Sequence, residues 1–495
     1  MATAAGTTKH IVLFPFPGRG HLAGFLAVAR LLRATSPDVA VTLVSTPRNI
    51  AALCARCWSN VGLHALPFVP ANHDLPVDCE STSSLPLPEF ITLFEAFESL
   101  EPAFDDFVSG LLAGGRGTVC VVADAFVAWT VRVARRRGCG HAFFLSCGAL
   151  GTAVLHALWN NMPALPFAPD DGLLHLPEHP QLVLHRTQVS RTFLDARPGL
   201  DRWMAYHRRQ ILHGYQTDAV LINTVEAFEP TGLAMVRRTI GEFVPVWPIG
   251  PLVRNDEEFA SSEKTITDDA VLSWLDTQRL ASVLYISFGS QNSIQLTQMT
   301  ELAAALESTG RPFVWAIRPP VGFDINSAFR NEWLPEGFEG RACAASRGLL
   351  VRGWAPQVNI LAHASTGAFL THCGWNSVLE SLTRGVPLVG WPVAAEQFYN
   401  AKMLEEWGVC LEVARGNLES SAVDRSKVAE VLELVMGDRA ESAGMRRRVK
   451  ELQELMKMAW AEDGGSSRTA LLEFLTAMRL TYDTGETESQ GSPPP

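Results

Sequence analysis

One local pattern opens two distant parts of this sequence, and it restricts the fold more than any other feature. Each part begins with a short apolar run, turns through small residues into an amphipathic helical stretch, and then reaches another apolar run. The first copy comprises the run 10–17, the turn Gly18–Gly20, the helix 22–33 and the strand 39–44; the second comprises the strand 281–288, the turn Gly289–Ser290, the helix 296–307 and the strands 313–317 and 349–351. Because strand–helix–strand units place their strands in parallel, the sequence predicts two doubly wound α/β domains, with ligands at the carboxyl ends of the strands.

The length of the chain agrees with two domains, because 495 residues exceed what one hydrophobic core usually organises. We expect an N-terminal domain over residues 1–250 and a C-terminal domain over 271–465. Between them, 251–270 is expected to form a linker and surface loop. A C-terminal helix over 466–480 and a disordered polar tail over 481–495 complete the expected organisation.

Composition and charge argue against several classes of protein. Apolar residues make up 47% of the chain and charged residues 19%, as in ordinary globular proteins. The net charge of −11 argues against a nucleic-acid partner, because phosphate binding needs a basic face. No run of about 18 apolar residues is present, so we expect no membrane span. The beginning of the chain lacks the apolar segment of a signal peptide, which favours a cytoplasmic protein, and we expect a monomer.

The nine cysteines are scattered, apart from the pair Cys54 and Cys57. A single C-x-x-C could be redox-active or could form half of a zinc site. No second pair completes a tetrad, and the flanking Leu53 and Trp58 are typical of a buried helix, so we favour a structural role. The odd number and the scatter predict reduced thiols.

The densest group of chemically useful residues lies between 354 and 397. It contains Trp354-Ala355-Pro356-Gln357, then Thr371-His372-Cys373-Gly374-Trp375-Asn376-Ser377, and finally Gly390-Trp391-Pro392 and Glu396-Gln397. Within it, 368–371 predicts a strand and 375–384 a helix that ends at Gly385.

This segment has the chemistry of a nucleotide site. The free amides at the start of the predicted helix, with His372, Asn376 and Ser377 beside them, suit a diphosphate. Trp354 offers a flat face on which a base can stack. Glu380 can accept hydrogen bonds from both hydroxyl groups of a ribose.

Each of these residues also has an interpretation that needs no ligand. Ser377 and Glu380 match the S-x-x-E capping box. Glu396 can be an acid that stabilises the start of the helix following it, and Trp354 and Trp391 can be core residues. The joint occurrence of all of them in one segment, rather than any single residue, favours a ligand site.

Residues 354–397 resemble the signature box of plant family-1 UDP-glycosyltransferases, which act on secondary metabolites and hormones. The resemblance covers nearly the whole chain through individually weaker segments: Gly20-His21-Leu22, Val122-Ala123-Asp124, Leu221-Ile222-Asn223-Thr224, Trp274-Leu275-Asp276, Ser287-Phe288-Gly289-Ser290 and Gly464-Gly465-Ser466-Ser467. It implies an α/β protein of the GT-B fold, in which two Rossmann-like doubly wound domains face a central cleft. It also implies that the N-terminal domain binds the acceptor and the C-terminal domain binds the UDP-sugar.

The resemblance further implies roles for individual residues. The uracil-stacking Trp of the family falls on Trp354, with backbone contacts from Ala355 and Gln357. The residues that bind the diphosphate and the ribose, with the helix start that carries them, fall on Ser290, His372, Gly374, Trp375, Asn376, Ser377 and Glu380.

The sugar hydroxyls are expected at Glu396 and Gln397. Glu396 stands where the family usually has Asp and is one methylene longer. Gln397 is similar to the residue of glucose-using members, where galactose-using members often carry His. The resemblance therefore implies glucose as the sugar, with the Gln397 amide bridging neighbouring hydroxyls as donor and acceptor.

His21 matches the catalytic base of the family, and Asp124, after the predicted strand 119–123, matches its acidic partner. A histidine that titrates near neutral pH suits removal of a proton from an acceptor hydroxyl, and the acid would hold the ring and stabilise the imidazolium. One displacement without a covalent intermediate would invert an α-linked donor to a β-glycoside. Arg19 and Gly24 depart from the Gln and Pro that the family often has there, and neither change removes a catalytic group.

The chain contains no Asp-x-Asp triplet, which metal-dependent sugar transferases typically need. We therefore expect no metal and no other cofactor. The amides of the helix start and His372 would neutralise the diphosphate instead.

Two other functions are considered at this point. Residues 18–24, glycine-rich after a strand, are close to a dinucleotide fingerprint and would indicate an NADP-dependent reductase, but the second strand ends without an acid for the ribose. A UDP-sugar-binding protein without activity would be marked by the loss of His21 or Asp124, and both are present.

The sequence does not identify the acceptor, which the resemblance limits to a small lipophilic flavonoid, phenolic, terpenoid or hormone. Candidate pocket walls lie at 70–100, 140–160 and 185–210, and the stretch 70–88, rich in Pro, Ser and Asp, predicts a mobile loop. Four aromatic residues are candidates for either pocket or core: Phe14, Phe16, Phe126 and Trp129.

Overall fold

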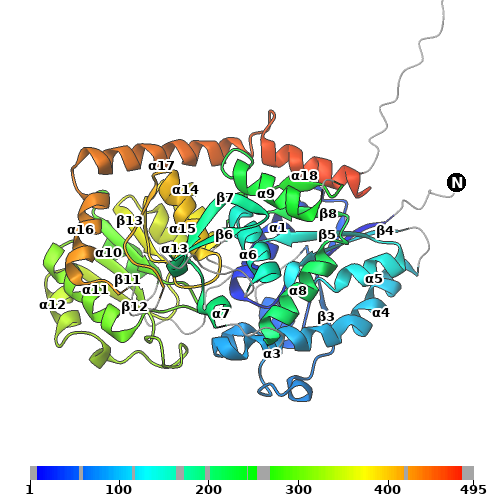
Figure 1. Cartoon of the computed structure of the whole chain (residues 1–495), viewed down its shortest axis with the longest axis horizontal. Coiled ribbons are helices and arrows are strands. Elements are labelled where there is room, and N and C mark those ends of the chain that lie inside the picture. Colours follow the sequence, from blue (N-terminus) through cyan, green and yellow to red (C-terminus); the bar gives the residue numbers. More distant parts are fainter. Residues whose placement is uncertain are drawn as a thin grey trace, which may run out of the picture.

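A computed structural model describes residues 8–54, 60–113, 117–162, 172–195, 201–241, 243–253, 268–416 and 422–481. Two lobes lie side by side, each built on a parallel sheet (Figure 1). The tail from 482, residues 254–267 of the expected linker, and Cys57 of the C-x-x-C pair lie outside the described residues. The seven cysteines whose side chains are described are all free thiols, as expected.

The N-terminal lobe contains a seven-stranded parallel sheet. Its strands, in spatial order, are β3 (Gly62–Ala65), β2 (Ala40–Ser45), β1 (Lys9–Phe14), β4 (Thr118–Asp124), β5 (Gly140–Leu145), β8 (Ala219–Ile222) and β9 (Val246–Pro248). β1, an interior strand between β2 and β4, is buried from Ile11 to Phe14, which explains why the sequence shows a continuous apolar run there rather than an alternating one. A separate hairpin is formed by β6 (Leu173–Leu176) and β7 (His179–His185).

Helices pack around this sheet, and some of them line the cavity described below. They are α1 (Arg19–Thr35), α2 (Pro47–Cys54), α3 (Phe90–Ala96), α4 (Glu101–Leu112), α5 (Thr130–Arg137), α6 (Ala149–Asn161), α7 (Arg191–Leu194), α8 (Arg202–Gly214) and α9 (Pro230–Ile240), with the 3₁₀ helices η4 (Phe97–Leu100), η5 (Ala125–Val127) and η6 (Arg186–Gln188).

α1 begins earlier than the sequence predicts. The amide of Leu22 already donates to the carbonyl of Gly18 (2.9 Å), and Gly18 is the extended residue at the N-cap. His21 therefore lies in the first turn of a helix rather than in a turn before it. Its position is consequently fixed by the helix backbone.

The expected mobile loop at 70–88 is a packed segment. It forms the 3₁₀ helices η1 (Pro70–His73), η2 (Thr82–Ser84) and η3 (Leu87–Glu89). Despite the polar composition, several side chains of the segment are buried, among them those of the apolar residues Leu75, Cys79 and Leu85. These apolar anchors hold the segment against the lobe.

The C-terminal lobe contains a six-stranded parallel sheet. Its spatial order is β12 (Gly348–Arg352), β11 (Phe313–Ile317), β10 (Val283–Ser287), β13 (Thr366–Thr371), β14 (Leu388–Gly390) and β15 (Cys410–Glu412). The helices are α10 (Asp268–Asp276), α11 (Leu296–Thr309), α12 (Phe338–Ala344), α13 (Gln357–Ala362), α14 (Trp375–Thr383), α15 (Gln397–Glu406), α16 (Arg425–Met436) and α17 (Ala440–Met458), with the 3₁₀ helix η8 (Asn331–Trp333). Gly385, after α14, has φ +73°, a conformation that favours glycine, and it ends the helix as predicted.

The final helix, α18 (Ser466–Ala477), returns to the N-terminal lobe. Figure 1 shows α17 running along the edge of one lobe and α18 continuing onto the other. Phe474 and Leu475 are buried in the core cluster that also contains Ile11 and Leu13 of β1. The Ser467 hydroxyl donates to the carbonyl of Gly250 (2.5 Å). The N-terminal lobe is thus completed by the last helix of the chain.

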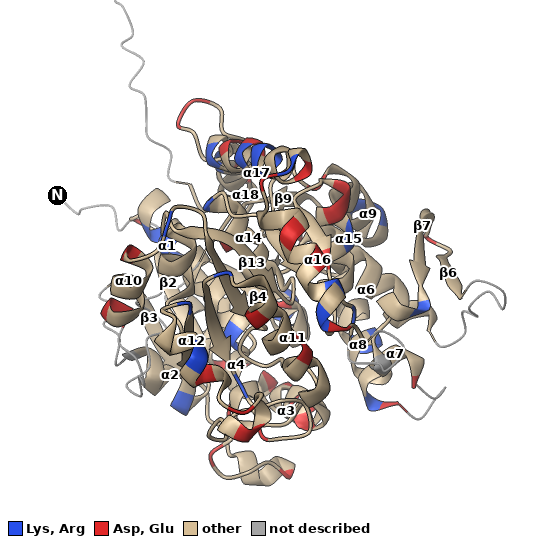
Figure 2. Ribbon diagram, turned by 90° about the vertical axis from the view of Figure 1, so that its left-hand side faces the viewer, with Lys and Arg blue, Asp and Glu red and all other residues tan. Residues whose placement is uncertain are grey.

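Acidic and basic residues are interspersed along the outer helices, as on α17 in the ribbon of Figure 2. Among the described residues, no helix has the length and apolar character needed to cross a membrane.

We predict that Phe474→Ala destabilises the protein by about 3–5 kcal/mol, because it removes a fully buried ring that also contacts Trp247. The midpoint of urea unfolding followed by circular dichroism measures this. The control is Leu472→Ala on the same helix, where the side chain is 43% exposed and the expected change is within about 0.5 kcal/mol. Equal midpoints for the two variants would contradict the packing of α18 described above.

Candidate active site

A cavity of about 630 Å³ lies between the two lobes and is lined by residues of both. The carboxyl ends of β1, β4 and β5 reach it from one side, and those of β10, β11, β12 and β13 reach it from the other. All the predicted site residues except Glu380 line this cavity. The predicted convergence at the strand ends is therefore present.

His21 and Asp124 form a hydrogen-bonded pair at the bottom of the N-terminal side. His21 Nδ1 lies 2.7 Å from Asp124 Oδ2, and the other carboxylate oxygen accepts from the amide of Phe126 (3.0 Å). Asp124 is 3% exposed, whereas His21 keeps 25% of its side chain exposed to the cleft. Because Asp124 holds Nδ1, the Nε2 atom is the ring nitrogen available to a substrate.

Opposing influences act on the pKa of His21. Burial lowers it, whereas the charge of Asp124, its hydrogen bond and the charge of Glu396 raise it. The net result is a pKa above the ordinary value of a histidine. The carboxylate therefore makes the imidazole a stronger base and stabilises its protonated form.

His372 is enclosed between two glycines opposite this pair. A Cβ at Gly289 would lie 2.7 Å from His372 Nε2, and one at Gly374 would lie 2.4 Å from the same atom. Burial lowers the pKa of His372 to about 4, so the ring is neutral at physiological pH. A nearby diphosphate would oppose this effect of burial, because an anion favours the protonated form.

The start of α14 faces the cavity beside His372. Gly374 is the N-cap, so Ser377 lies in the first turn and does not cap the helix. The capping-box interpretation of Ser377 and Glu380 is therefore wrong. Ser377 Oγ instead accepts from Gln357 Nε2 (3.0 Å), which leaves the amides of the first turn directed at the cleft.

Gln357 connects several predicted residues beneath the site. Its amide nitrogen also donates to Glu380 Oε2 (2.7 Å), and its Oε1 accepts from the Tyr285 hydroxyl (3.1 Å). Glu380 is buried behind Gln357, with 1% exposure, which explains why it does not line the cavity. The structure thus places Glu380 one layer behind the cavity wall.

The three tryptophans of the box have different environments. Trp354 is half-buried on the cavity wall. Trp391 is buried in the core, as the alternative interpretation proposed. Trp375 is also buried, and its indole N–H donates to the carbonyl of Asn223 in the opposite lobe (2.6 Å). The Trp375 side chain therefore joins the lobes, and only its backbone remains for a ligand.

Glu396 and Gln397 lie together at the start of α15. Burial raises the pKa of Glu396, and its carboxylate is close enough to influence that of His21. Gln397 Oε1 accepts from the backbone amides of Val393 (3.1 Å) and Ala394 (3.0 Å). The expectation that this amide both donates to and accepts from a sugar needs correction, because the oxygen is already engaged and Nε2 remains as the donor.

The N-terminal end of the cavity is aromatic, and all three predicted wall regions contribute to it. One lining residue from each region is Phe94, Trp159 and His207. Of the four aromatic candidates, Phe16 and Phe126 line the cavity, whereas Phe14 and Trp129 are core residues outside it. The ring of His207 stacks on Trp159, with centroids 4.1 Å apart, and burial lowers its pKa to about 3. This part of the cavity therefore presents flat, uncharged surfaces.

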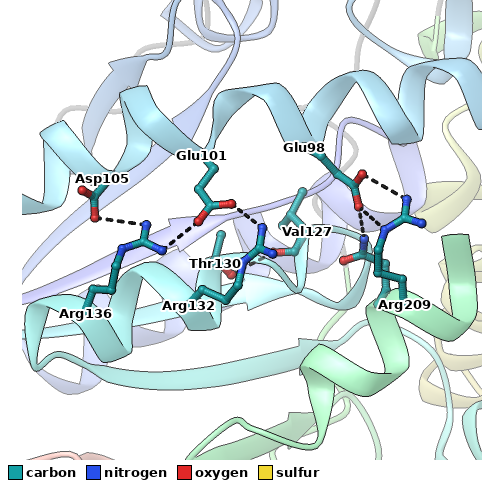
Figure 3. A network of polar contacts seen from close by, with 9 residues as sticks. Glu98, Glu101, Asp105, Val127, Thr130, Arg132, Arg136 and Arg209 are labelled. Atoms are coloured by element: carbon teal, nitrogen blue, oxygen red, sulfur yellow. Dashed lines mark hydrogen bonds and ion pairs between the residues drawn. The ribbon is translucent and has the colours of Figure 1, made fainter.

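A polar network outside the cavity holds α8, which carries His207 (Figure 3). Glu98 accepts from Arg209 Nε (2.9 Å) and from Gln210 Nε2 (2.7 Å), and Gln210 itself lines the cavity. Glu101 and Asp105 of α4 continue the row of ion pairs with arginines of α5. The wall is thus anchored by charge-assisted contacts from behind.

Comparison with known proteins identifies the family. A model described as the N-terminal domain of glycosyltransferases matches residues 8–254, and one described as UDP-glucoronosyl and UDP-glucosyl transferase matches 267–443. The chain is 41% identical to UDP-glycosyltransferase 92A1 of Arabidopsis thaliana over 84% of its own length and 86% of that protein. This chain belongs to the plant UDP-glycosyltransferases.

Two further comparisons agree. The glycosyltransferase is 40% identical to Crocetin glucosyltransferase 3 of Crocus sativus, over 84% of this chain and 89% of that one. Its structure is similar to that of Phytolacca americana UGT2 in complex with UDP-2fluoro-glucose and pterostilbene, with a TM-score of 0.76 and 28% identity over 95% of this chain and 100% of that chain. The predicted GT-B fold and the predicted family are confirmed, and the reductase alternative is excluded.

Arg318, which lines the cavity of the glycosyltransferase, was not among the predicted site residues. It directly follows β11, as Ser290 follows β10 and His372 follows β13. The rule that ligands bind at the carboxyl ends of strands would have found it. Trp203 and His207 lie within the predicted wall region 185–210 but were not singled out there, although their spacing of four places them on one face of α8.

We predict that Gly151→Ala lowers kcat/KM of the glycosyltransferase by about tenfold or more. A Cβ at this position of α6 would lie 2.9 Å from Glu396 Cβ and 3.2 Å from Asn400 Oδ1, so α15 would have to shift. Steady-state kinetics with a UDP-sugar measure the effect. Gly110→Ala in α4 is the matched control, because its Cβ would meet no atom within 4 Å. A Gly151→Ala enzyme as active as the control would contradict the close approach of α6 to Glu396.

Proposed function

We propose that this glycosyltransferase transfers glucose from UDP-glucose to a hydroxyl group of a small lipophilic acceptor and inverts the anomeric configuration. The observation that carries the proposal is the His21–Asp124 pair, which faces the start of α14 across one cavity. A general base and a diphosphate site on opposite sides of a cleft suit direct displacement. The Crocus sativus relative is named as a glucosyltransferase, and the Phytolacca americana structure holds a UDP-glucose analogue, which support the choice of sugar.

The C-terminal lobe would bind the donor. Trp354 offers its ring to the uracil, and the amides of α14 with His372 and Ser290 would surround the diphosphate. Glu396 would accept hydrogen bonds from the sugar hydroxyls, and Gln397 Nε2 would donate to one. These residues supply the compensating dipoles, so no step of the proposed mechanism needs a metal.

The N-terminal lobe would bind the acceptor. Its aromatic surfaces, with the neutral rings of His156 and His207 among them, suit a flat, uncharged molecule such as a phenolic. The two carboxylates that line the cavity, Asp124 and Glu396, both lie near His21. A negatively charged acceptor group would be repelled there, whereas a hydroxyl would not.

The chemical step would transfer one proton and exchange one bond. His21 Nε2 takes the proton of the acceptor hydroxyl as its oxygen attacks the anomeric carbon. The bond from that carbon to the diphosphate breaks, and UDP leaves with the electron pair. Asp124 stabilises the imidazolium that forms. Attack from the side opposite UDP converts an α-linked donor into a β-glucoside.

We predict that His21→Ala lowers kcat by roughly 10²–10⁴ and leaves UDP affinity nearly unchanged, since the residue acts on the acceptor. In the unmodified enzyme, kcat/KM should rise with pH and level off above the ordinary pKa of histidine, because only neutral His21 is a base and its pKa is raised. Asp124→Asn removes the charge that raises this pKa, so the remaining activity should level off at lower pH. Initial rates across pH 5–9 test this.

His175→Ala, which changes an exposed histidine of β6, is the control for these variants and should behave as the unmodified enzyme. A His21→Ala enzyme that keeps more than half of its rate on an aliphatic alcohol would exclude His21 as the base.

We predict that UDP-glucose is preferred over UDP-galactose by about tenfold or more in kcat/KM. The two sugars differ in the direction of one hydroxyl, and an unpaired polar group costs about 1–3 kcal/mol. UDP-glucuronate should be poorer still, because buried Glu396 would face its carboxylate. Competing donors can be compared by mass spectrometry with a panel of flavonols, simple phenols and terpenols. Equal or faster transfer from another donor would refute glucose and leave the transferase activity intact.

A further inference from the structure

Arg318 places a cation on the wall of the cavity. It follows β11, lines the cavity and is only partly exposed. Among the residues that the structure describes, it makes no hydrogen bond or ion pair. Burying an unpaired guanidinium is unfavourable, so a group that supplies hydrogen-bond acceptors at this position would be bound strongly.

The strand register places Arg318 beside Trp354 rather than beside the start of α14. Ile317, the last residue of β11, pairs with Arg352 of β12. Arg318 is therefore level with Gly353, which directly precedes Trp354. The diphosphate site proposed above lies at the ends of β10 and β13, on the other side of β11.

A second arginine approaches the same place from the N-terminal lobe. The guanidinium carbon of Arg19, in the first turn of α1, lies 5.6 Å from the ring centroid of Trp354. Burial and the charge of Arg19 together lower the pKa of Arg318 to about 10, which leaves it protonated at neutral pH. Two cations, one from each lobe, thus lie close enough to influence one another beside the segment that carries Trp354.

We propose that Arg318 binds the uridine part of the donor by donating to a uracil carbonyl oxygen and to the ribose, while Arg19 closes over the base from the N-terminal lobe. This inference rests on the proposed function. Uracil carries two carbonyl acceptors and arginine has only donors, so their chemistry is complementary. A guanidinium plane also stacks on a base as an aromatic ring does. The donor site is then completed by a residue of the lobe that binds the acceptor.

The test measures binding of UMP and UDP to the full chain by isothermal titration calorimetry. Arg318→Gln should weaken both by about tenfold or more and by the same factor, because the contact lies on the nucleoside. The KM for UDP-glucose should rise with kcat nearly unchanged. Arg19→Gln should also weaken both nucleotides equally. Arg311→Gln is the control, since Arg311 lies before the other end of β11 and pairs with Glu433 at the surface.

A second readout separates binding from folding. Without nucleotide, Arg318→Gln should unfold at the same temperature as the unmodified protein or higher, because it removes a half-buried charge for which the described residues supply no partner. The stabilisation that UDP adds should shrink. Arg318→Lys keeps the charge but loses the planar, two-pronged array of guanidinium donors, so it should also bind UDP less tightly.

Two outcomes would overturn the inference. Unchanged UMP and UDP affinity in Arg318→Gln excludes the contact, and a loss much larger for UDP than for UMP places the arginine on the β-phosphate. Unchanged affinity in Arg19→Gln removes Arg19 from the site. Failure of the unmodified chain to bind UDP or to transfer a sugar would refute the proposed function itself. Failure of the proposed function is therefore distinguishable from failure of the inference about Arg318.

Discussion

The start of α14 rests on the start of α1, and the geometry of the cleft depends on this contact. Asn376 Nδ2 donates to the carbonyl of Gly20 (3.1 Å), the residue before His21. One residue earlier, Trp375 reaches Asn223, and its ring fills the space that a side chain at Gly148 would need. The helix that would bind the diphosphate and the helix that carries the base are therefore positioned against one another directly. A change in either helix start alters both halves of the site.

Charge is separated along this cleft. The cations among its described lining residues, Arg19 and Arg318, lie at the Trp354 end, and the anions, Asp124 and Glu396, lie near His21. In a partly desolvated cavity such fixed charges act more strongly than in water. This arrangement favours an anionic leaving group held away from the carboxylates and a neutral acceptor next to them. It also raises the basicity of His21 without placing a cation beside it.

Most of the fold could be predicted because buried parallel strands leave an unmistakable pattern. The predicted strands at 10–17 and 281–288, which open the two copies of the pattern, correspond to β1 and β10. The predicted strand and helix on either side of Gly374 correspond to β13 and α14 and end within a residue or two of them. The start of α1 was set too late, because Gly18 and Gly20 were interpreted as a turn although Gly18 is only the N-cap. Without a capping side chain, the local sequence does not distinguish a glycine-rich turn from a helix that begins at a glycine N-cap.

The details of the site were less predictable, because they depend on which partner a side chain finds. Gln397 accepts a hydrogen bond from the loop that precedes it, Trp375 donates to the opposite lobe, and Glu380 accepts from Gln357. No sequence motif predicts any of these three hydrogen bonds. Phe14 and Phe16 are two residues apart, yet only Phe16 faces the cavity, because β1 ends between them. When a sheet is buried on both faces, its strands are apolar throughout, so the sequence does not show which apolar residue lines the cavity and which lies in the core.

The return of α18 has a mechanical consequence. The chain passes between the lobes twice, once after Gly250 and once before Ser467, and these two residues are hydrogen-bonded to each other. Because Gly250 and Ser467 are hydrogen-bonded, we expect any relative motion of the lobes to be a rotation about this point. Elsewhere the lobes are joined by hydrogen bonds from Gln291 to Thr82 and from Asn326 to the carbonyl of Ser83, which such a rotation would break.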